Sequence, residues 1–262
     1  MSRGAAFFDL DKTLMAGSSG MQFARVATRQ GIVSRRLLAS WAFEHLRYRL
    51  RGTTDERTAE VLKVARELIS AVPEKTIERM GPEVMAAILP RVYPQMLDEV
   101  HAHQDAGRAT FIVSAAGNGV VESLASVLGM DGGIGTRYEV GADGNFTGRL
   151  DGPFVYGAGK VEAMQAFAAR HEIDLAASYA YSDSLSDLPM LRAVGNPVAV
   201  NPDPPLAEIA KQEGWQTLRF ERLGRRLVAI SVTLLATVAG FGASRVAGRR
   251  KPSPRRLPLR RI

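Results

Sequence analysis

Residues 5–14 read Ala-Ala-Phe-Phe-Asp-Leu-Asp-Lys-Thr-Leu, an apolar run that ends in acidic residues. A short continuous apolar run is typical of a parallel strand that is buried on both faces of a sheet. Such a strand would present Asp9 and Asp11 at its carboxyl end, which is where open α/β sheets bind their ligands. This stretch therefore predicts a buried strand and the place of a functional site.

Further short apolar runs recur along the chain, and most of them end in polar residues. They cover 109–113, which Ser114 follows, then 178–181, which Ser182 and Asp183 follow, and 198–200. Helical patterns over 118–128, 160–171 and 186–193 alternate with them, and Ala-Asp-Gly-Asn at 142–145 predicts a hairpin turn within 138–150. Strands that alternate with helices predict an α/β fold, here a Rossmann-like doubly wound parallel sheet with helices on both faces.

The stretch from about residue 18 to 94 contains helical periodicity and no strand pattern. Segments 37–50 and 58–69 place apolar residues three and four positions apart, which is typical of amphipathic helices. We therefore expect an inserted helical cap over residues 15–95. The catalytic core would then consist of residues 1–14 and 96–221.

Four short signatures follow one another in the expected positions. They are Asp9-Leu10-Asp11-Lys12-Thr13-Leu14, the strand that ends at Ser114, Lys160 at the start of a helix, and Asp183-Ser184-Leu185-Ser186-Asp187. In this order they resemble the haloacid dehalogenase superfamily, and most closely its subfamily IB, which contains phosphoserine phosphatase and its relatives. The resemblance spans roughly residues 5–220.

The resemblance implies a phosphomonoester hydrolase that depends on magnesium and forms an aspartyl-phosphate. Asp9 would attack phosphorus and bind the metal. Asp11 would protonate the leaving oxygen and later activate water, while its main-chain carbonyl and Asp183 would complete the protein ligands of the metal. A carboxylate that attacks an anionic ester needs a hard cation to offset the repulsion, and Mg²⁺ with oxygen ligands suits that role.

The same resemblance assigns the remaining polar residues to the phosphate and its surroundings. Thr13, Ser114 and Lys160 would hold phosphate oxygens, and Lys160 would neutralise charge in the transition state. Asp187 would orient Lys160 or a metal-bound water. The role of Lys12 stays open, with a solvated side chain as the default.

Other catalytic arrangements are poorly matched. Residues 157–160 read Gly-Ala-Gly-Lys, like the end of a P-loop, but Phe154 and Val161 stand where that motif needs glycine and Ser or Thr. The chain contains no cysteine, which excludes thiolate chemistry. His101 and His103 point to opposite sides of a predicted helix, and both are expected on the surface.

The substrate is less sharply predicted than the chemistry. Phosphoserine phosphatases carry a glutamate shortly after the first motif, which recognises the amino group of the substrate. Ser18 stands at that position, and no acidic residue occurs between Asp11 and Glu44. We expect a small phosphorylated substrate, either phosphoserine-like or a lipid-precursor phosphate. The alternatives are a phosphotransferase with the same intermediate and a membrane-tethered binding module without catalysis.

The C-terminal segment differs in character from the rest. Residues 222–262 contain eleven Lys or Arg and no acid, so the net charge of +7 leaves −4 for residues 1–221. Residues 227–244 form an uncharged, largely apolar run of eighteen residues. We expect residues 222–262 to form an apolar, membrane-associated helix, spanning or lying on the membrane, followed by a basic tail. The catalytic domain would be cytoplasmic, and its acidic balance does not suggest a nucleic-acid partner.

Overall fold

The computed structural model describes residues 3–34, 62–63, 66, 69 and 72–220. The chain divides into two compact units, residues 1–219 and 220–262, and the fold below is that of the first. The predicted apolar helix over 227–244, the basic tail and the predicted helix over 37–50 lie outside the described residues. Within the described ranges, no helix is long and apolar enough to cross a membrane.

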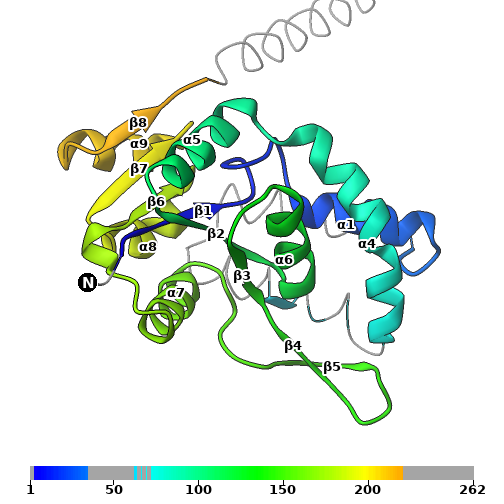
Figure 1. Cartoon of the computed structure of the whole chain (residues 1–262). Helices are drawn as coiled ribbons and strands as arrows, with labels where there is room; N and C mark the ends of the chain where they lie inside the picture. Colours follow the sequence, from blue (N-terminus) through cyan, green and yellow to red (C-terminus); the bar gives the residue numbers. More distant parts are fainter. Residues whose placement is uncertain (1–2, 35–61, 64–65, 67–68, 70–71, 221–262) are drawn as a thin grey trace, which may run out of the picture. The chain divides into compact units, whose positions relative to one another are not determined.

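The core of the fold is a six-stranded sheet in which every paired strand is parallel (Figure 1). Its strand order is β3-β2-β1-β6-β7-β8. Strands β2 and β3 follow β1 towards one edge of the sheet, and β7 and β8 follow β6 towards the other edge. This α/β architecture confirms the predicted fold class. The strands are β1 Ala5–Asp9, β2 Ala109–Gly117, β3 Gly132–Thr136, β6 Tyr179–Ser182, β7 Asn196–Val200 and β8 Gln216–Leu218.

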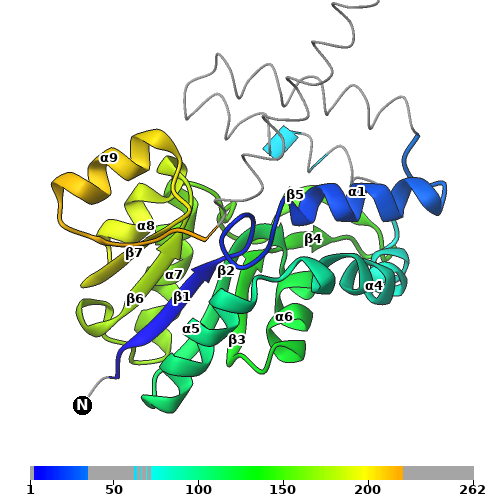
Figure 2. The ribbon, with the colours of Figure 1, turned by 90° about the horizontal axis from the view of Figure 1, so that it is seen from above.

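Helices cover both faces of this sheet (Figure 2). Helices α5 (Pro94–Asp105) and α6 (Asn118–Val127) lie on one face, and α7 (Ala158–Arg170), α8 (Leu188–Arg192) and α9 (Pro204–Gln212) lie on the other. All five residues of β1 are buried, with Phe7 facing the α7 side and Phe8 the α5 side. Burial on both faces explains why β1 is a continuous apolar run. Among the described residues, 3-10 turns lie at Leu89–Arg91 before α5, at Leu175–Ala177 before β6 and at Leu185–Asp187 before α8.

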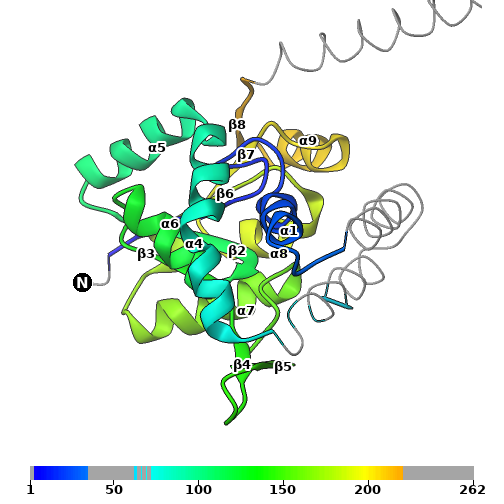
Figure 3. The ribbon, with the colours of Figure 1, turned by 90° about the vertical axis from the view of Figure 1, so that its right-hand side faces the viewer.

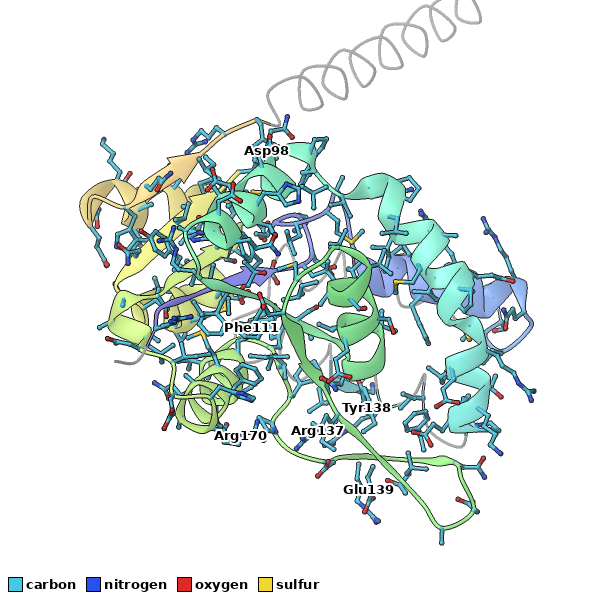
Figure 4. The ribbon with its side chains drawn as sticks, in the orientation of Figure 1. Asp98, Phe111, Arg137, Tyr138, Glu139 and Arg170 are labelled. Carbon is cyan, nitrogen blue, oxygen red and sulfur yellow. The ribbon has the colours of Figure 1, made fainter. Side chains whose placement is uncertain are left out.

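Two further groups of elements extend from the sheet. Helices α1 (Ser19–Arg29) and α4 (Glu74–Ile88) pack side by side (Figure 3). Strands β4 (Tyr138–Val140) and β5 (Phe146–Leu150) form the predicted hairpin, and Figure 4 labels Tyr138 and Glu139 on its first strand. Gly144 has a φ of 78° in its turn, a conformation that glycine adopts without strain.

Strand β3 is absent from the sequence prediction because its residues are mostly glycine. A Cβ atom on Gly133 would lie 2.7 Å from a Val121 side-chain carbon, and one on Gly135 would lie 2.6 Å from the Cα of Asn118. Helix α6 therefore packs directly on the backbone of β3. The close approach requires small residues, which removes the apolar pattern by which a strand is usually predicted.

The expectation of a surface position is wrong for His103, which is only 3% exposed, whereas His101 is exposed. The Arg108 Nε–H donates to His103 Nδ1 at 2.7 Å, so the ring proton must lie on Nε2. His103 Nε2 lies 2.7 Å from the Tyr181 hydroxyl, which donates to Glu99 at 3.1 Å. This chain of donors holds the imidazole neutral.

His103 should make folding sensitive to mild acid. Burial, and secondarily the charge of Arg108, lowers the pKa of His103 from 6.5 to about 4. The unfolded chain therefore takes up this proton first, so stability is complete above pH 6.5 and is lost as the pH falls towards 4. The loss attributable to His103 should approach about 3 kcal/mol. Denaturant unfolding at pH 7.5 and 4.5 would measure this loss of stability. The control is His103→Gln, which lacks the imidazole and keeps every other titratable group. An equal pH dependence in both proteins would contradict this assignment.

Candidate active site

The carboxyl ends of β1, β2 and β6 meet at the point where the strand order changes direction. Asp9 pairs with Val113, the residue before Ser114. Phe8 pairs with Tyr181, two residues before Asp183. The two neighbours of β1 thus place Ser114 and Asp183 beside Asp9, at the position where doubly wound sheets bind ligands.

Lys160 joins two carboxylates at the centre of this site. Its Nζ lies 2.5 Å from Asp9 Oδ1 and 2.6 Å from Asp187 Oδ2. The lysine is 3% exposed and Asp9 is 6% exposed, so the ion pairs are shielded from water. The Ser182 hydroxyl also donates to Asp187 Oδ2, at 2.7 Å. Sequence reasoning did not single out Ser182, and nothing but its place at a strand end would have indicated it.

The glycines before Lys160 have a structural reason that is unrelated to a P-loop. Gly157 precedes α7 with φ 54° and ψ −122°, a conformation that strongly favours glycine. A Cβ on Gly159 would collide with the main-chain oxygen of Phe154. These two residues bring the first turn of α7 close to the preceding loop and point Lys160 into the core.

The loop after β1 holds the second oxygen of Asp9. The Thr13 hydroxyl donates to Asp9 Oδ2 at 3.0 Å, and the Leu14 N–H donates to the Asp9 main-chain oxygen at 3.2 Å. Lys12 has a φ of 61°, so the chain turns sharply between Asp9 and Leu14. Both carboxylate oxygens of Asp9 therefore have fixed partners.

Ser114, Asp183 and Asp11 lie at the same end of the sheet with other partners. Ser114 is buried, and its hydroxyl accepts from the Ala116 N–H at 3.2 Å. Asp183 Oδ2 lies 3.6 Å from Lys12 Nζ, whose side chain is 47% exposed. Asp11 accepts hydrogen bonds from Ser18, the N-cap of helix α1, and from Ser19, the first residue of that helix.

The site carries an excess of negative charge. Asp9, Asp11, Asp183 and Asp187 supply four carboxylates, against the two ammonium groups of Lys12 and Lys160. Burial raises the pKa of Asp9 and that of Asp183 above the ordinary carboxyl value, although Lys160 opposes the first shift and Lys12 the second. An anionic substrate cannot readily enter such a site unless further positive charge accompanies it.

At Lys160 the neighbouring charges outweigh burial in setting the pKa. Burial alone lowers the pKa of its ammonium group, but Asp187 and Asp9 outweigh burial and hold that pKa above its ordinary value. The lysine is therefore a permanent cation between two carboxylates. Such a group can bind an anion and neutralise charge, but it cannot act as a base near neutral pH.

Comparison with known proteins identifies the arrangement. The family model for haloacid dehalogenase-like hydrolases matches residues 6–192. The chain belongs to this family. This match confirms the resemblance to the haloacid dehalogenase (HAD) superfamily that the four sequence signatures indicated.

Curated relatives cover nearly the whole HAD-like chain. An "inhibition of morphological differentiation protein" of Streptomyces azureus is 38% identical, over 93% of this chain and 90% of its own. A phosphoserine phosphatase of Mycobacterium tuberculosis is 32% identical, over 94% of this chain and 81% of its own. A histidinol-phosphatase of Neisseria meningitidis is 30% identical, over 84% and 100%. The named relatives thus include two phosphatases with different substrates.

Solved structures share the fold of this HAD-like hydrolase. A protein of unknown function from Bordetella pertussis has a TM-score of 0.72 and 31% identity, over 83% of this chain and 99% of its own. A substrate-bound phosphoserine phosphatase has a TM-score of 0.60 and 19% identity, over 87% and 99%. The second likeness concerns the fold alone.

Proposed function

We propose that this HAD-like hydrolase is a magnesium-dependent phosphatase that cleaves phosphomonoesters through a phosphorylated Asp9. The observation that carries the proposal is the buried triad in which Lys160 contacts Asp9 and Asp187. It holds Asp9, the carboxylate that would act as nucleophile, beside a permanent cation. The curated relatives that are named phosphatases support the same reaction class.

The reaction would proceed in two steps. In the first, an Asp9 carboxylate oxygen attacks phosphorus, the bond to the ester oxygen breaks, and Asp11 gives its proton to the departing alcohol. In the second, Asp11 takes a proton from water, the water oxygen attacks the same phosphorus, and Asp9 leaves as a carboxylate. The products are an alcohol and phosphate, and both residues return to their initial states.

The remaining residues would stabilise the phosphoryl group during transfer. Lys160 offers an ammonium group, and hydroxyls are offered by Thr13 in the loop after β1 and by Ser114, which lies within β2 because that strand continues beyond the predicted end to Gly117. Donors that are already fixed stabilise developing charge without reorganisation. Asp187 would act through Lys160, because the two side chains are in direct contact.

The donor set fits a hard divalent cation. Asp9, Asp183 and the main-chain carbonyl of Asp11 would hold it, since oxygen ligands and a locally negative site suit Mg²⁺. No group of three or more Asp, Glu, His or Cys side chains gathers around a common point in the described part of the chain. A Mg²⁺ site with two carboxylates, one carbonyl and water does not require such a group. When bound, the ion would offset the repulsion between the carboxylate and the phosphate.

Lys12 should weaken the binding of this cation, because its ammonium group lies 3.6 Å from Asp183. Replacing Lys12 with glutamine is expected to tighten Mg²⁺ binding by about three- to tenfold at low salt. Isothermal titration of the folded protein with MgCl₂ would measure the change. Lys12→Arg, which keeps the charge, is the matched control. An unchanged or weaker affinity in the glutamine variant would show that Lys12 does not compete for Asp183.

The substrate would be a small phosphomonoester, and a panel assay can identify its class. We would measure phosphate release with Mg²⁺ from phosphoserine, histidinol phosphate, sugar phosphates, nucleotides and lysophospholipid phosphates. Preference for a lipid phosphate would favour a lipid-precursor substrate. Release of the alcohol without phosphate would instead indicate transfer to another acceptor. Failure of every ester with folded, magnesium-loaded protein would contradict the proposal.

The location of the enzyme remains a prediction from the sequence. A cytoplasmic catalytic domain held at a membrane through residues 227–244 and the basic tail would suit a lipid-precursor substrate. The assignment of residues 15–95 to a cap that closes over the site is likewise proposed from the sequence.

A further inference from the structure

The carboxylate of Asp11 is held by the first residues of helix α1. The Ser18 hydroxyl donates to Asp11 Oδ2 at 3.1 Å, and the Ser19 N–H donates to Oδ1 at 2.7 Å. The Ser18 oxygen also accepts from the Met21 N–H at 3.4 Å, which makes Ser18 the N-cap of the helix. One serine thus connects the helix terminus to the Asp11 side chain.

Asp11 also supplies a charge that the helix itself lacks. The first turn of α1 contains no acidic residue, although a negative charge stabilises the start of a helix. Two donors from consecutive residues, each on a different carboxylate oxygen, leave the Asp11 side chain little freedom to rotate. A carboxyl group has about four lone-pair positions, so about two remain for a proton and a substrate oxygen.

We propose that Ser18 is a positioning residue that orients Asp11 for proton transfer. This inference rests on the proposed function, in which Asp11 is the acid and base. Helix α1 lies within the predicted cap, so the same contact ties the orientation of Asp11 to the placement of that helix. Ser18 occupies the position where phosphoserine phosphatases carry their substrate-binding glutamate, and here its hydroxyl is directed to Asp11.

The leaving group offers a test that a purely structural role would not affect. The p-nitrophenolate anion departs without protonation, whereas an alcohol needs a proton from Asp11. We would compare kcat/KM for p-nitrophenyl phosphate with that for the best alkyl ester among phosphoserine, histidinol phosphate and glycerol phosphate. The proteins are the wild type, Ser18→Ala, Ser18→Thr and Asp11→Asn, all assayed with Mg²⁺ at a temperature where thermal melting shows each to be folded.

Ser18→Ala should reduce kcat/KM about tenfold more for the alkyl ester than for p-nitrophenyl phosphate. Ser18→Thr keeps a hydroxyl and should restore both values to within about twofold of wild type. Asp11→Asn should show the same discrimination more strongly. An equal loss on both esters, or no rescue by threonine, would overturn the role of Ser18 while leaving the proposed function intact. A wild-type protein that cleaves neither ester would overturn both.

Discussion

Replacing Asp9 with asparagine is expected to reduce phosphate release by at least about four orders of magnitude. The amide has nearly the same shape as the carboxylate but is a very weak nucleophile. Steady-state assays on the best ester of the panel, with Mg²⁺, would measure the loss. Residual activity within about a hundredfold of wild type would mean that Asp9 is not the nucleophile.

The same substitution should leave the fold intact, which separates chemistry from stability. Burial disfavours the ionised form of Asp9 and Lys160 favours it, but the neighbouring acids Asp187, Asp183 and Asp11 add repulsion, so that the pKa of Asp9 is raised. A neutral side chain removes that repulsion, while Lys160 keeps its contact with Asp187. Thermal melting without Mg²⁺ should therefore give a midpoint at or above that of wild type. A large drop would indicate that lost activity reflects unfolding.

Replacing Lys160 with methionine is expected to damage both activity and stability. The variant loses the cation beside the transferred phosphoryl group, which should lower kcat/KM by about two to three orders of magnitude. It also leaves Asp9 and Asp187 buried without their common partner. Breaking a buried ion pair in this way typically costs about 3–5 kcal/mol of unfolding free energy. Urea unfolding at pH 8 without Mg²⁺ would measure the second effect.

The stability of this variant should rise more steeply than that of wild type as the pH falls, because Lys160 opposes the upward pKa shift of Asp9 in wild type. Without Lys160, burial raises the pKa of Asp9 further above its ordinary value in the folded protein. The folded state then binds more protons than the unfolded state, so stability is recovered as the pH falls from 8 towards 5. Lys160→Met combined with Asp9→Asn and Asp187→Asn is the control, because it removes both charges. Equal stability of the single variant and wild type at pH 8 would contradict the assigned ion pairs.

Much of the fold could be predicted because its central strands are buried on both faces. The apolar runs of β1, β2 and β6 are visible in the sequence for that reason, and the hairpin turn at 142–145 has a specific glycine requirement. Strand β3 could not be predicted, since its glycines make room for α6. The edge strand β8 is three residues long and mostly exposed, so it has no apolar pattern.

The proximity of Asp9 and Asp183 could be predicted because both stand at the carboxyl ends of strands, whereas Ser114 lies within β2, which continues to Gly117. The bridge from Lys160 to Asp9 spans 151 residues, and no local pattern indicates such a contact. The contact between Ser18 and Asp11 and that between Ser182 and Asp187 depend on side-chain directions that the sequence does not encode in a readable form. His103 shows the same limit, because its burial depends on the distant Tyr181.

The central claim, covalent catalysis by Asp9, is most directly tested by trapping the phosphorylated enzyme. Wild type would be mixed with its best ester and Mg²⁺, denatured in acid within milliseconds, and reduced with borohydride, which converts an acyl phosphate to an alcohol. Peptide mass spectrometry should then find homoserine at position 9, in Asp11→Asn as well as wild type, and not in Asp9→Asn. An active wild-type enzyme that yields no modified residue 9, even when Asp11→Asn slows the second step, would contradict the account.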